Sequence, residues 1–354
     1  MARILFVDQF AQWGGGQHVA FDVIQELLRR GHTITAALPE EGLFSTALRD
    51  IGVEVFRFQL PKLSSGQKTF SDFVKFMRGM PQAGMRLRTI FRSNRCDSIY
   101  LNGARCIHPC CFFLSKVPTL FYAHLIYSGQ NRRIISGASK GFRDFKVICP
   151  SQAVQDALSP LPSILIPNWI RDEFLLPVVP QPQGSLVVGI AGRISKNKGQ
   201  DLLIDAMRPL LETGRASLKI AGDSDFEDPV FAAALRESAP IGVEFLGAVK
   251  NMPAFYDSVN VLAVPSETEA FGLVAVEAMA RARPVVASLT GGLVDIVQDG
   301  VTGLFAERTI EGLREAIESL TVARCEELGD QARIGVIDKF SKERNLALVA
   351  DLFN

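Results

Sequence analysis

The stretch PSETEAFGLVAVEAMARARPVVASLTGGLVDIVQDGVTGLF, residues 265–305, decides how this chain folds. It places Glu269 and Glu277 eight positions apart, separated by an apolar turn at residues 270–273. The turn follows residues 259–264, a pattern typical of a buried strand, and precedes a pattern typical of a helix. Because backbone N–H groups at a helix start favour negative charge, free carboxylates placed there indicate a ligand that carries both phosphate and hydroxyl groups.

This segment resembles the signature of the family 4 retaining glycosyltransferases, in which two glutamates separated by seven residues precede an Ala-Met-Ala run and a Pro-Val-Val strand. The resemblance continues in order through about forty residues, far beyond a chance short motif. It includes Gly291, Gly292, Asp299, Gly300, Thr302 and Gly303. The resemblance implies the GT-B architecture, in which two Rossmann-like α/β domains face each other across a cleft.

The rest of the chain predicts two doubly wound α/β domains. In both halves, strand-like runs alternate with helical patterns, which is typical of parallel sheets with helices on both faces. Three prolines in a polar stretch at 177–184 disfavour helix and sheet. We expect an acceptor-side domain at 1–170, a proline-rich linker at 171–185, a nucleotide-sugar-binding domain at 186–340 and a C-terminal helix at 341–354, which in GT-B proteins commonly crosses back to the first domain.

Arg193 and Lys198 lie between the strand-like run 186–191 and a helix that begins near Gly199. Ligands of open α/β sheets bind at the carboxyl ends of the strands, so this loop is a candidate site. It resembles the family's Arg and Lys pair that holds the donor diphosphate. Two cations there would neutralise the charge on the leaving nucleoside diphosphate, and no metal ion would be required. The alternative is an ordinary basic loop.

The resemblance also assigns roles within the signature. Glu277 matches the glutamate that accepts hydrogen bonds from the ribose hydroxyls, and Glu269 matches the one that contacts the transferred sugar. A carboxylate suits both tasks because it can accept two hydroxyl donors at once. Phe271, Gly272 and Leu273 would offer backbone N–H groups to sugar and phosphate, with Gly272 allowing close approach.

Two features of the first half are weaker candidates. A glycine run at 14–16 lies between the first strand and the first helix, where backbone can approach a phosphate. By resemblance, Gly15 and Gly16 lie nearest the donor phosphate, although a plain turn is the alternative. His124 ends a short apolar strand and resembles the family's active-site histidine near the transferred sugar. A purely structural histidine is the alternative.

The sequence departs from the family pattern at five positions, which leave the donor sugar undetermined: Trp169, Ile170, Ala270, Ala282 and Asp295.

Two motifs invite a metal interpretation, and we predict that neither binds metal. The triplet Asp223, Ser224 and Asp225 spells the DxD motif of the other large glycosyltransferase fold, but here it stands where the family has a loop. The second motif lacks a further Cys or His pair at the spacing of a zinc site, which favours structural thiols: Cys106, His108, Cys110 and Cys111.

Charge divides unevenly along a chain of zero net charge. Residues 1–170 contain 20 Lys and Arg against 11 Asp and Glu, a net charge of +9, whereas residues 171–354 contain 18 against 27, a net charge of −9. The basic half favours an anionic partner such as a membrane surface, and no nucleic acid is expected. Residues 70–95 combine apolar and basic residues at helical spacing, which fits either a helix on anionic lipid or a helix packed on the sheet: Phe70, Phe73, Val74, Lys75, Met77, Arg78, Met85, Arg86, Leu87, Arg88, Ile90, Phe91, Arg92 and Arg95.

The sequence predicts a retaining glycosyltransferase that moves a sugar from a UDP- or GDP-linked donor to a hydroxyl of a glycan or lipid-linked acceptor, in polysaccharide or glycolipid synthesis. The start of the chain shows no signal peptide pattern, so we expect a cytoplasmic protein, peripheral at the inner face of the membrane. One alternative is a nucleotide-sugar epimerase of the same fold, which needs acid and base residues around C2 of the sugar. Another is a catalytically silent membrane-associated subunit, which would lose the Arg, Lys and paired Glu.

Overall fold

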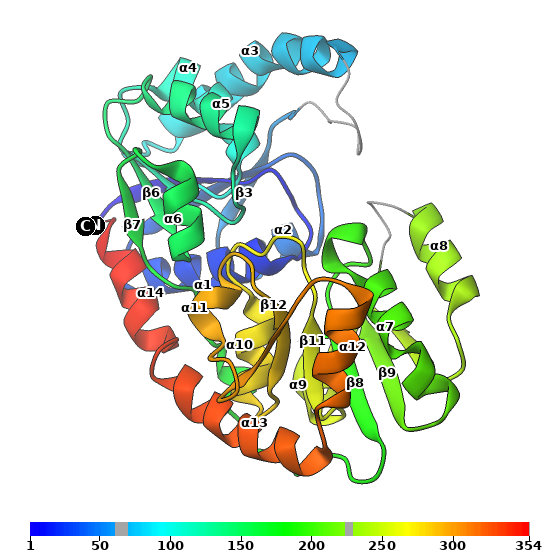
Figure 1. Ribbon diagram of the computed structural model, residues 1–354. Helices are drawn as coiled ribbons and strands as arrows, with labels where there is room; N and C mark the ends of the chain where they lie inside the picture. The colour runs from blue at the N-terminus through cyan, green and yellow to red at the C-terminus, as the bar shows by residue number, and fades with distance from the viewer. Residues whose placement is uncertain (61–69, 224–228, 354) are drawn as a thin grey trace. The chain divides into compact units, whose positions relative to one another are not determined.

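The computed structural model describes residues 1–60, 70–223 and 229–353 (Figure 1). The chain divides into two compact units, the first comprising Met1–Pro167 with Glu343–Asn354 and the second Asn168–Lys342. Each unit contains one parallel sheet with α-helices packed against it. The predicted fold class, two Rossmann-like α/β domains, is confirmed.

The first sheet has seven parallel strands in the order β3-β2-β1-β4-β5-β6-β7. The chain reverses its direction of winding between β1 and β4, and such switch points are where α/β sheets bind ligands. The strands are β1 (Arg3–Val7), β2 (Thr33–Leu38), β3 (Glu54–Arg57), β4 (Ser98–Leu101), β5 (Thr119–Tyr122), β6 (Phe145–Cys149) and β7 (Ser163–Leu165).

Helices cover both faces of this sheet, and Figure 1 shows α3, α4 and α5 together on one side of it and α1 and α14 on the other. The helices are α1 (Gly15–Arg29), α2 (Leu43–Asp50), α3 (Phe70–Ser93), α4 (Ile107–Leu114), α5 (Gly129–Ser139), α6 (Gln152–Leu158) and α14 (Lys342–Asp351), with a 3₁₀ turn at Ala104–Cys106.

Helix α3 packs its apolar stripe inward. Ala83, Leu87 and Ile90 are buried, as expected for residues that recur on one face of a helix. Gly84 allows α4 to approach, because a Cβ there would lie 2.0 Å from the ring of Phe113. Of the two interpretations that the sequence left open, packing holds for this part of the helix. The side chains of residues 70–78 lie outside the described part of the structure.

The C-terminal helix α14 belongs to the first unit. Arg30 at the end of α1 donates a hydrogen bond of 2.5 Å to Asp351. The ring of Phe353 lies 5.6 Å from that of Tyr100 on β4 in an edge-to-face arrangement. These contacts attach the end of the chain to the sheet that its beginning forms.

The second sheet has six parallel strands in the order β10-β9-β8-β11-β12-β13, and its switch point lies between β8 and β11. The strands are β8 (Leu186–Ala191), β9 (Ala216–Ala221), β10 (Val243–Gly247), β11 (Val261–Val264), β12 (Val285–Ser288) and β13 (Gly303–Ala306). The helices are α7 (Gln200–Glu212), α8 (Pro229–Ser238), α9 (Met252–Asp257), α10 (Leu273–Ala280), α11 (Leu293–Ile296), α12 (Ile310–Glu318) and α13 (Val322–Ile337), with 3₁₀ turns at Asp172–Phe174 and Lys196–Lys198.

Strand β11 shows why this sheet needs helices on both sides. Val261 and Ala263 belong to the apolar cluster that includes α7 and α12. Leu262 and Val264 belong to the cluster that includes α9, α10 and α13. Because successive side chains of a strand point to opposite faces, a wholly apolar strand must be covered on both.

The proline-rich segment lies inside the second unit, whose boundary falls between Pro167 and Asn168. Residues 177–184 form neither helix nor strand. Gln181 is buried and donates hydrogen bonds of 3.1 Å to the carbonyl oxygens of Ala282 and Cys325. The segment expected as a linker therefore packs against the domain that follows it.

Candidate functional site

Two loops meet at the switch point of the second sheet, one after β8 and one after β11. The backbone N–H of Glu267 donates to the carbonyl of Asn197 (2.8 Å), and the hydroxyl of Thr268 donates to its side-chain oxygen (3.0 Å). Gly199 has φ of 73°, and a Cβ there would lie 2.6 Å from the carbonyl oxygen of Pro265. A side chain at residue 199 would force these loops apart.

A buried amide holds the β8–α7 loop in shape. Gln200, the first residue of α7, is fully buried. Its Nε2 donates to the carbonyl of Arg193 (2.9 Å), and its Oε1 accepts from the backbone N–H of Ser195 (3.3 Å). The backbone of Arg193 is therefore fixed, and its side chain is exposed at the carboxyl end of β8.

Lys198 and Glu269, which the sequence proposed separately, form an ion pair in the structure. Lys198 Nζ lies 2.6 Å from Glu269 Oε2, and both side chains are mostly buried. The hydroxyl of Ser266 also donates to this oxygen (3.3 Å). The carbonyl of Glu269 accepts the backbone N–H of Gly292 (2.9 Å), so this hydrogen bond joins the loop after β11 to the loop after β12. This arrangement places a cation and an anion side by side at the carboxyl ends of strands β8 and β11.

Helix α10 begins immediately after this pair. Gly272 precedes its first residue with φ of 110°, a conformation that favours glycine, and a Cβ there would lie 2.8 Å from Leu293. The first N–H groups of a helix have no partner within it and carry partial positive charge. Backbone N–H groups near Phe271, Gly272 and Leu273 therefore suit an anionic or hydroxyl-bearing ligand.

Glu277 lies one turn into α10 and is 7% exposed. Its Oε2 accepts from the hydroxyl of Tyr256 (2.9 Å), and its Oε1 accepts from Arg171 (3.2 Å). Arg171 also pairs with Glu173 (2.7 Å). Burial raises the pKa of Glu277 above its usual value, while Arg171 and Tyr256 oppose that shift. The sequence did not point to Arg171 or Tyr256, because neither belongs to the signature.

The first unit also gathers polar side chains at its switch point. Asp8, which follows β1, is fully buried and accepts from Gln17 Nε2 (2.9 Å) and from Asn102 Nδ2 (2.6 Å). Asn102 follows β4, and its Oδ1 lies 2.7 Å from Nε2 of His124. The sequence proposed His124 but missed Asp8 and Asn102. The available signal for Asp8 was a charged residue directly after the apolar run at residues 4–7.

His124 and the glycine loop lie in contact. A Cβ on Gly16 would lie 2.9 Å from the Cδ2 atom of His124, so glycine allows the loop to reach the ring. The ring stacks on Tyr122 with centroids 4.5 Å apart and planes 7° apart. Burial lowers the pKa of His124 to about 3, so the imidazole is neutral near pH 7. Gly15 begins α1, beside Gly16.

The motifs with a metal interpretation lie elsewhere. Asp223 pairs with Arg236 (3.0 Å), and Ser224 and Asp225 fall outside the described residues. Cys106 and Cys110 are buried free thiols. Within residues 1–60, 70–223 and 229–353, no group of three His, Cys, Asp or Glu side chains is arranged to hold a metal ion.

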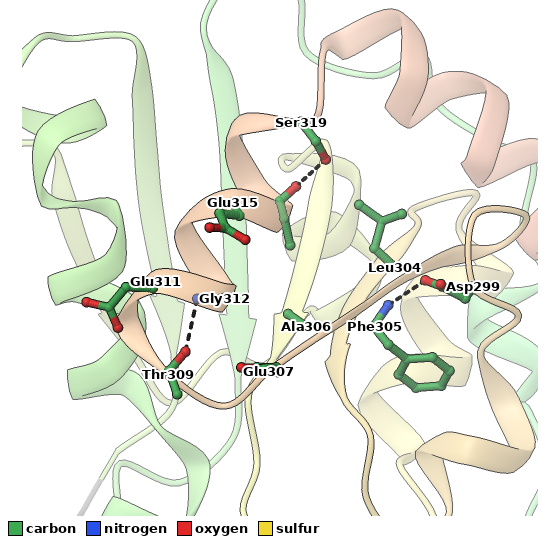
Figure 2. A pocket seen from close by; sticks show the side chains of 11 residues that line it. Asp299, Leu304, Phe305, Ala306, Glu307, Thr309, Glu311, Gly312, Glu315 and Ser319 are labelled. Carbon is green, nitrogen blue, oxygen red and sulfur yellow. Dashed lines mark hydrogen bonds between the residues drawn. The ribbon is translucent and has the colours of Figure 1, made fainter.

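A cavity of about 530 Å³ opens between β13 and α12, and Figure 2 shows that its wall is acidic. Asp299 accepts the backbone N–H of Phe305 (2.9 Å), and Thr309 accepts that of Gly312 (3.0 Å). The wall also carries Glu307, Glu311 and Glu315. These carboxylates would repel a diphosphate, so the cavity does not replace the candidate site at the switch point.

Comparisons with known protein families cover most of the chain. Residues 13–174 match the family described as Glycosyltransferase Family 4, and residues 172–333 match Glycosyl transferases group 1. The chain therefore belongs to the family 4 glycosyltransferases, as the signature at 265–305 predicts.

Curated relatives match over part of their length. A D-inositol 3-phosphate glycosyltransferase of Corynebacterium aurimucosum is 36% identical over 149 residues, which is 39% of this chain and 35% of that protein. An uncharacterized glycosyltransferase of Methanocaldococcus jannaschii is 30% identical over 207 residues, 54% of this chain and 55% of that protein. The capsular polysaccharide biosynthesis glycosyltransferase CapM of Staphylococcus aureus is 30% identical over 164 residues, 45% of this chain and 43% of that protein. The matched segment thus spans about a third to about half of each relative.

Solved structures resemble the whole chain. HepE of Anabaena in complex with UDP-glucose superimposes with a TM-score of 0.83 at 22% identity, covering 99% of both chains. Sucrose-phosphate synthase of Thermosynechococcus elongatus gives a TM-score of 0.79 at 19% identity, covering 99% of this chain and 98% of that one. These likenesses establish the GT-B fold. In the part of the chain that the structure describes, no helix combines the length and apolarity needed to cross a membrane.

Proposed function

We propose that this protein is a retaining glycosyltransferase that moves a sugar from a nucleotide sugar to a hydroxyl of a glycan or lipid-linked acceptor, without a metal ion. The observation that carries the proposal is the Lys198–Glu269 ion pair at the start of α10, with the buried carboxylate of Glu277 one turn further on. A cation, a helix start and two carboxylates match the phosphates and hydroxyls of a nucleotide sugar.

Each residue of the second unit has a role in this proposal. Arg193 and Lys198 bind the diphosphate and stabilise its charge as the sugar departs. Glu277 accepts hydrogen bonds from the ribose hydroxyls, held for that purpose by Tyr256 and Arg171. Glu269 orients the transferred sugar, and the backbone N–H groups at residues 271–273 bind sugar and phosphate oxygens.

In the first unit, Gly15 and Gly16 bind the donor phosphate through the backbone at the start of α1. His124 contacts the transferred sugar. Retention follows a front-face route, in which the acceptor hydroxyl attacks beside the departing diphosphate. The protein then needs no nucleophile of its own, and the leaving phosphate receives the proton of the acceptor hydroxyl.

The donor proposed is a UDP- or GDP-sugar, and solved HepE complexes with UDP and UDP-glucose favour UDP. Calorimetry of the purified protein with a panel of both classes tests this. We expect one donor to bind equally well with and without EDTA. Glu277→Ala should weaken binding at least about a hundredfold, because two charge-assisted hydrogen bonds are lost. Glu318→Ala, on the exposed face of α12, is the matched control. If no nucleotide sugar or nucleotide binds the wild-type protein, the proposal fails.

The stereochemistry needs its own experiment. With the donor identified, NMR of the product reports the anomeric configuration of the new linkage. Retention of the donor configuration supports the front-face route. Inversion would reject it and would require a general base that removes the proton of the acceptor hydroxyl.

We also propose that the first unit docks at the cytoplasmic face of an anionic membrane, near a lipid-linked acceptor. The outer face of α3 exposes Arg86, Arg88 and Arg92, and a hollow of about 490 Å³ along α5 is lined by Arg132 and Arg133. Flotation with vesicles of anionic lipid should recover the protein, whereas zwitterionic vesicles should not. Arg88→Glu with Arg92→Glu should abolish recovery, because each basic residue near such a surface contributes about 1 kcal/mol. Equal recovery on both vesicle types would reject the docking.

A further inference from the structure

The carboxylate of Asp8 has no role in the function proposed above, yet it is fully buried at the switch point of the first sheet. Its partners are the side-chain amides of Gln17 and Asn102 and the backbone N–H groups of Phe10 (3.1 Å) and Gln9. Among the described residues, it forms no salt bridge. Burying a carboxylate with neutral donors alone is costly, so its position calls for a structural or functional reason.

The partners of Asn102 determine which way its amide group points. A carboxylate only accepts hydrogen bonds, and so does a backbone carbonyl. Asn102 Nδ2 lies 2.6 Å from Asp8 and 3.4 Å from the carbonyl of Gly16, so both neighbours on this side are acceptors. The amide oxygen must therefore face the other side, where the hydroxyl of Tyr100 donates to it (3.4 Å).

The orientation of this amide dictates the tautomer of His124. Asn102 Oδ1 lies 2.7 Å from Nε2 of the ring, and an amide oxygen only accepts. Nε2 must then carry the hydrogen. A neutral imidazole has one N–H group, which leaves Nδ1 with a lone pair. The contact of Cδ2 with Gly16 and the stacking on Tyr122 fix the ring, with the Nδ1 edge opposite Asn102.

We propose that Asp8 and Asn102 are positioning residues that hold His124 as its Nε2–H tautomer and present Nδ1 as the acceptor for a hydroxyl of the transferred sugar. The identity of that hydroxyl rests on the proposed transferase function, whereas the tautomer is a property of the protein alone. Asp8 acts through Asn102, so its charge sets the direction of a hydrogen bond two side chains away.

Nitrogen NMR of the protein labelled with ¹⁵N-histidine tests the tautomer directly, because pyrrole-type and pyridine-type nitrogens have well-separated shifts. The chain has four histidines, and the His124→Gln spectrum identifies the signals of His124. We expect a pyrrole-type Nε2 and a pyridine-type Nδ1 in the wild-type protein at pH 7. A hydrogen on Nδ1, or on both nitrogens, overturns the proposal without any variant being needed.

Two variants test the chain of hydrogen bonds from Asp8 through Asn102 to His124, which we call the relay. In Asp8→Asn the new amide can present either its oxygen or its nitrogen, so only the longer contact with the Gly16 carbonyl (3.4 Å) still favours the wild-type orientation of Asn102, and the second tautomer should appear. Asn102→Leu removes the acceptor and should have the same effect, while Asp50→Asn on exposed α2 should keep the wild-type pattern. Unchanged signals from the other histidines show that each variant is folded. A His124 spectrum unchanged in a folded Asp8→Asn protein would exclude Asp8 from the relay.

Activity separates this proposal from the function on which it rests. If the donor is transferred, Asp8→Asn should lower kcat about tenfold, the loss of one well-oriented hydrogen bond, with donor affinity unchanged. If no sugar is transferred but the tautomer responds as expected, the relay stands and the transferase proposal fails. If kcat is unchanged in Asp8→Asn while the tautomer is lost, the contact of Nδ1 with the sugar is rejected.

Discussion

The two units place polar side chains at equivalent switch points but use them differently. In the second unit, charged side chains pair directly with one another, as Lys198 does with Glu269. In the first unit, the charge of Asp8 is buried behind neutral amides and reaches His124 through Asn102. A charged side chain in the second unit, such as Lys198, can exchange its protein partner for a ligand. The buried carboxylate of Asp8 in the first unit can only orient the side chains between it and the ligand. Three changes test this difference.

The largest effect is expected from the second unit. Lys198→Ala removes a cation that would stabilise the leaving diphosphate, and kcat should fall about a hundredfold to a thousandfold, as for other lost donors to a developing charge. Initial rates over a range of donor concentrations give kcat and KM, with Lys250→Ala, exposed in the same unit, as the control. A rise in KM with kcat unchanged would mean that Lys198 binds ground state and transition state equally. The contrast between the two units would then lose its chemical basis.

The second change concerns the cost of burying Asp8. Burial raises the pKa of Asp8 from 3.8 to about 6, which means that the folded protein holds this proton more tightly than the unfolded chain does. The stability contributed by protonated Asp8 is therefore present below about pH 4 and is lost as pH rises through about 6. The loss amounts to about 3 kcal/mol, at about 1.4 kcal/mol per pKa unit. The Asp8→Asn variant has no titratable group at this position, so its stability should not show this loss.

The titratable groups near Asp8 do not obscure the stability difference between wild type and Asp8→Asn from pH 4 to 7. Burial raises the pKa values of Tyr100, Tyr127 and Cys106, and it lowers that of His124 to about 3. All four are therefore neutral between pH 4 and 7 in the folded protein. His124 still titrates near pH 6.5 in the unfolded chain, but that contribution is common to wild type and Asp8→Asn and cancels in their difference.

Urea unfolding at pH 4, 5, 6 and 7 measures the difference between wild type and Asp8→Asn, and Trp13 reports on the first unit when both carry Trp169→Phe. A difference that does not vary with pH would show that Asp8 titrates normally.

The same contrast explains what the sequence could predict. Strand β8 (Leu186–Ala191) matches the predicted range 186–191 because it is an apolar run with clear ends. The prediction missed β3 (Glu54–Arg57), β7 (Ser163–Leu165) and β13 (Gly303–Ala306), which are all edge strands. An edge strand is short and partly exposed, so its residues lack the continuous apolar pattern of a central strand.

The residues of the candidate site also differ in how far the sequence alone predicts them. Lys198, Glu269 and Glu277 are charged residues at the ends of apolar strands or within the signature, so their positions are visible in the sequence. Asn102 is not, because its importance depends on a hydrogen bond to Asp8, 94 residues earlier, which β1 and β4 create by lying side by side. Amides at such positions look like ordinary loop residues until the strand order is known.

The smallest effect is expected from Tyr256. Its hydroxyl supports Glu277 in the second unit, as Asn102 supports His124 in the first. Tyr256→Phe removes the hydrogen bond to Glu277 Oε2 and should weaken nucleotide binding about fivefold, or about 1 kcal/mol. That hydrogen bond also lowers the pKa of Glu277 against the effect of burial, so its loss should raise the pKa further. Binding requires the ionised carboxylate of Glu277, so the loss of nucleotide binding on acidification should begin at a higher pH in the variant.

Calorimetric titrations from pH 5 to 8 measure both effects. Ser258→Ala, which removes a hydroxyl at the end of α9, the helix that carries Tyr256, is the control. An affinity that falls equally at every pH would mean that the Tyr256 hydroxyl positions Glu277 without changing its pKa, and Glu277 would then depend on Arg171 for its charge.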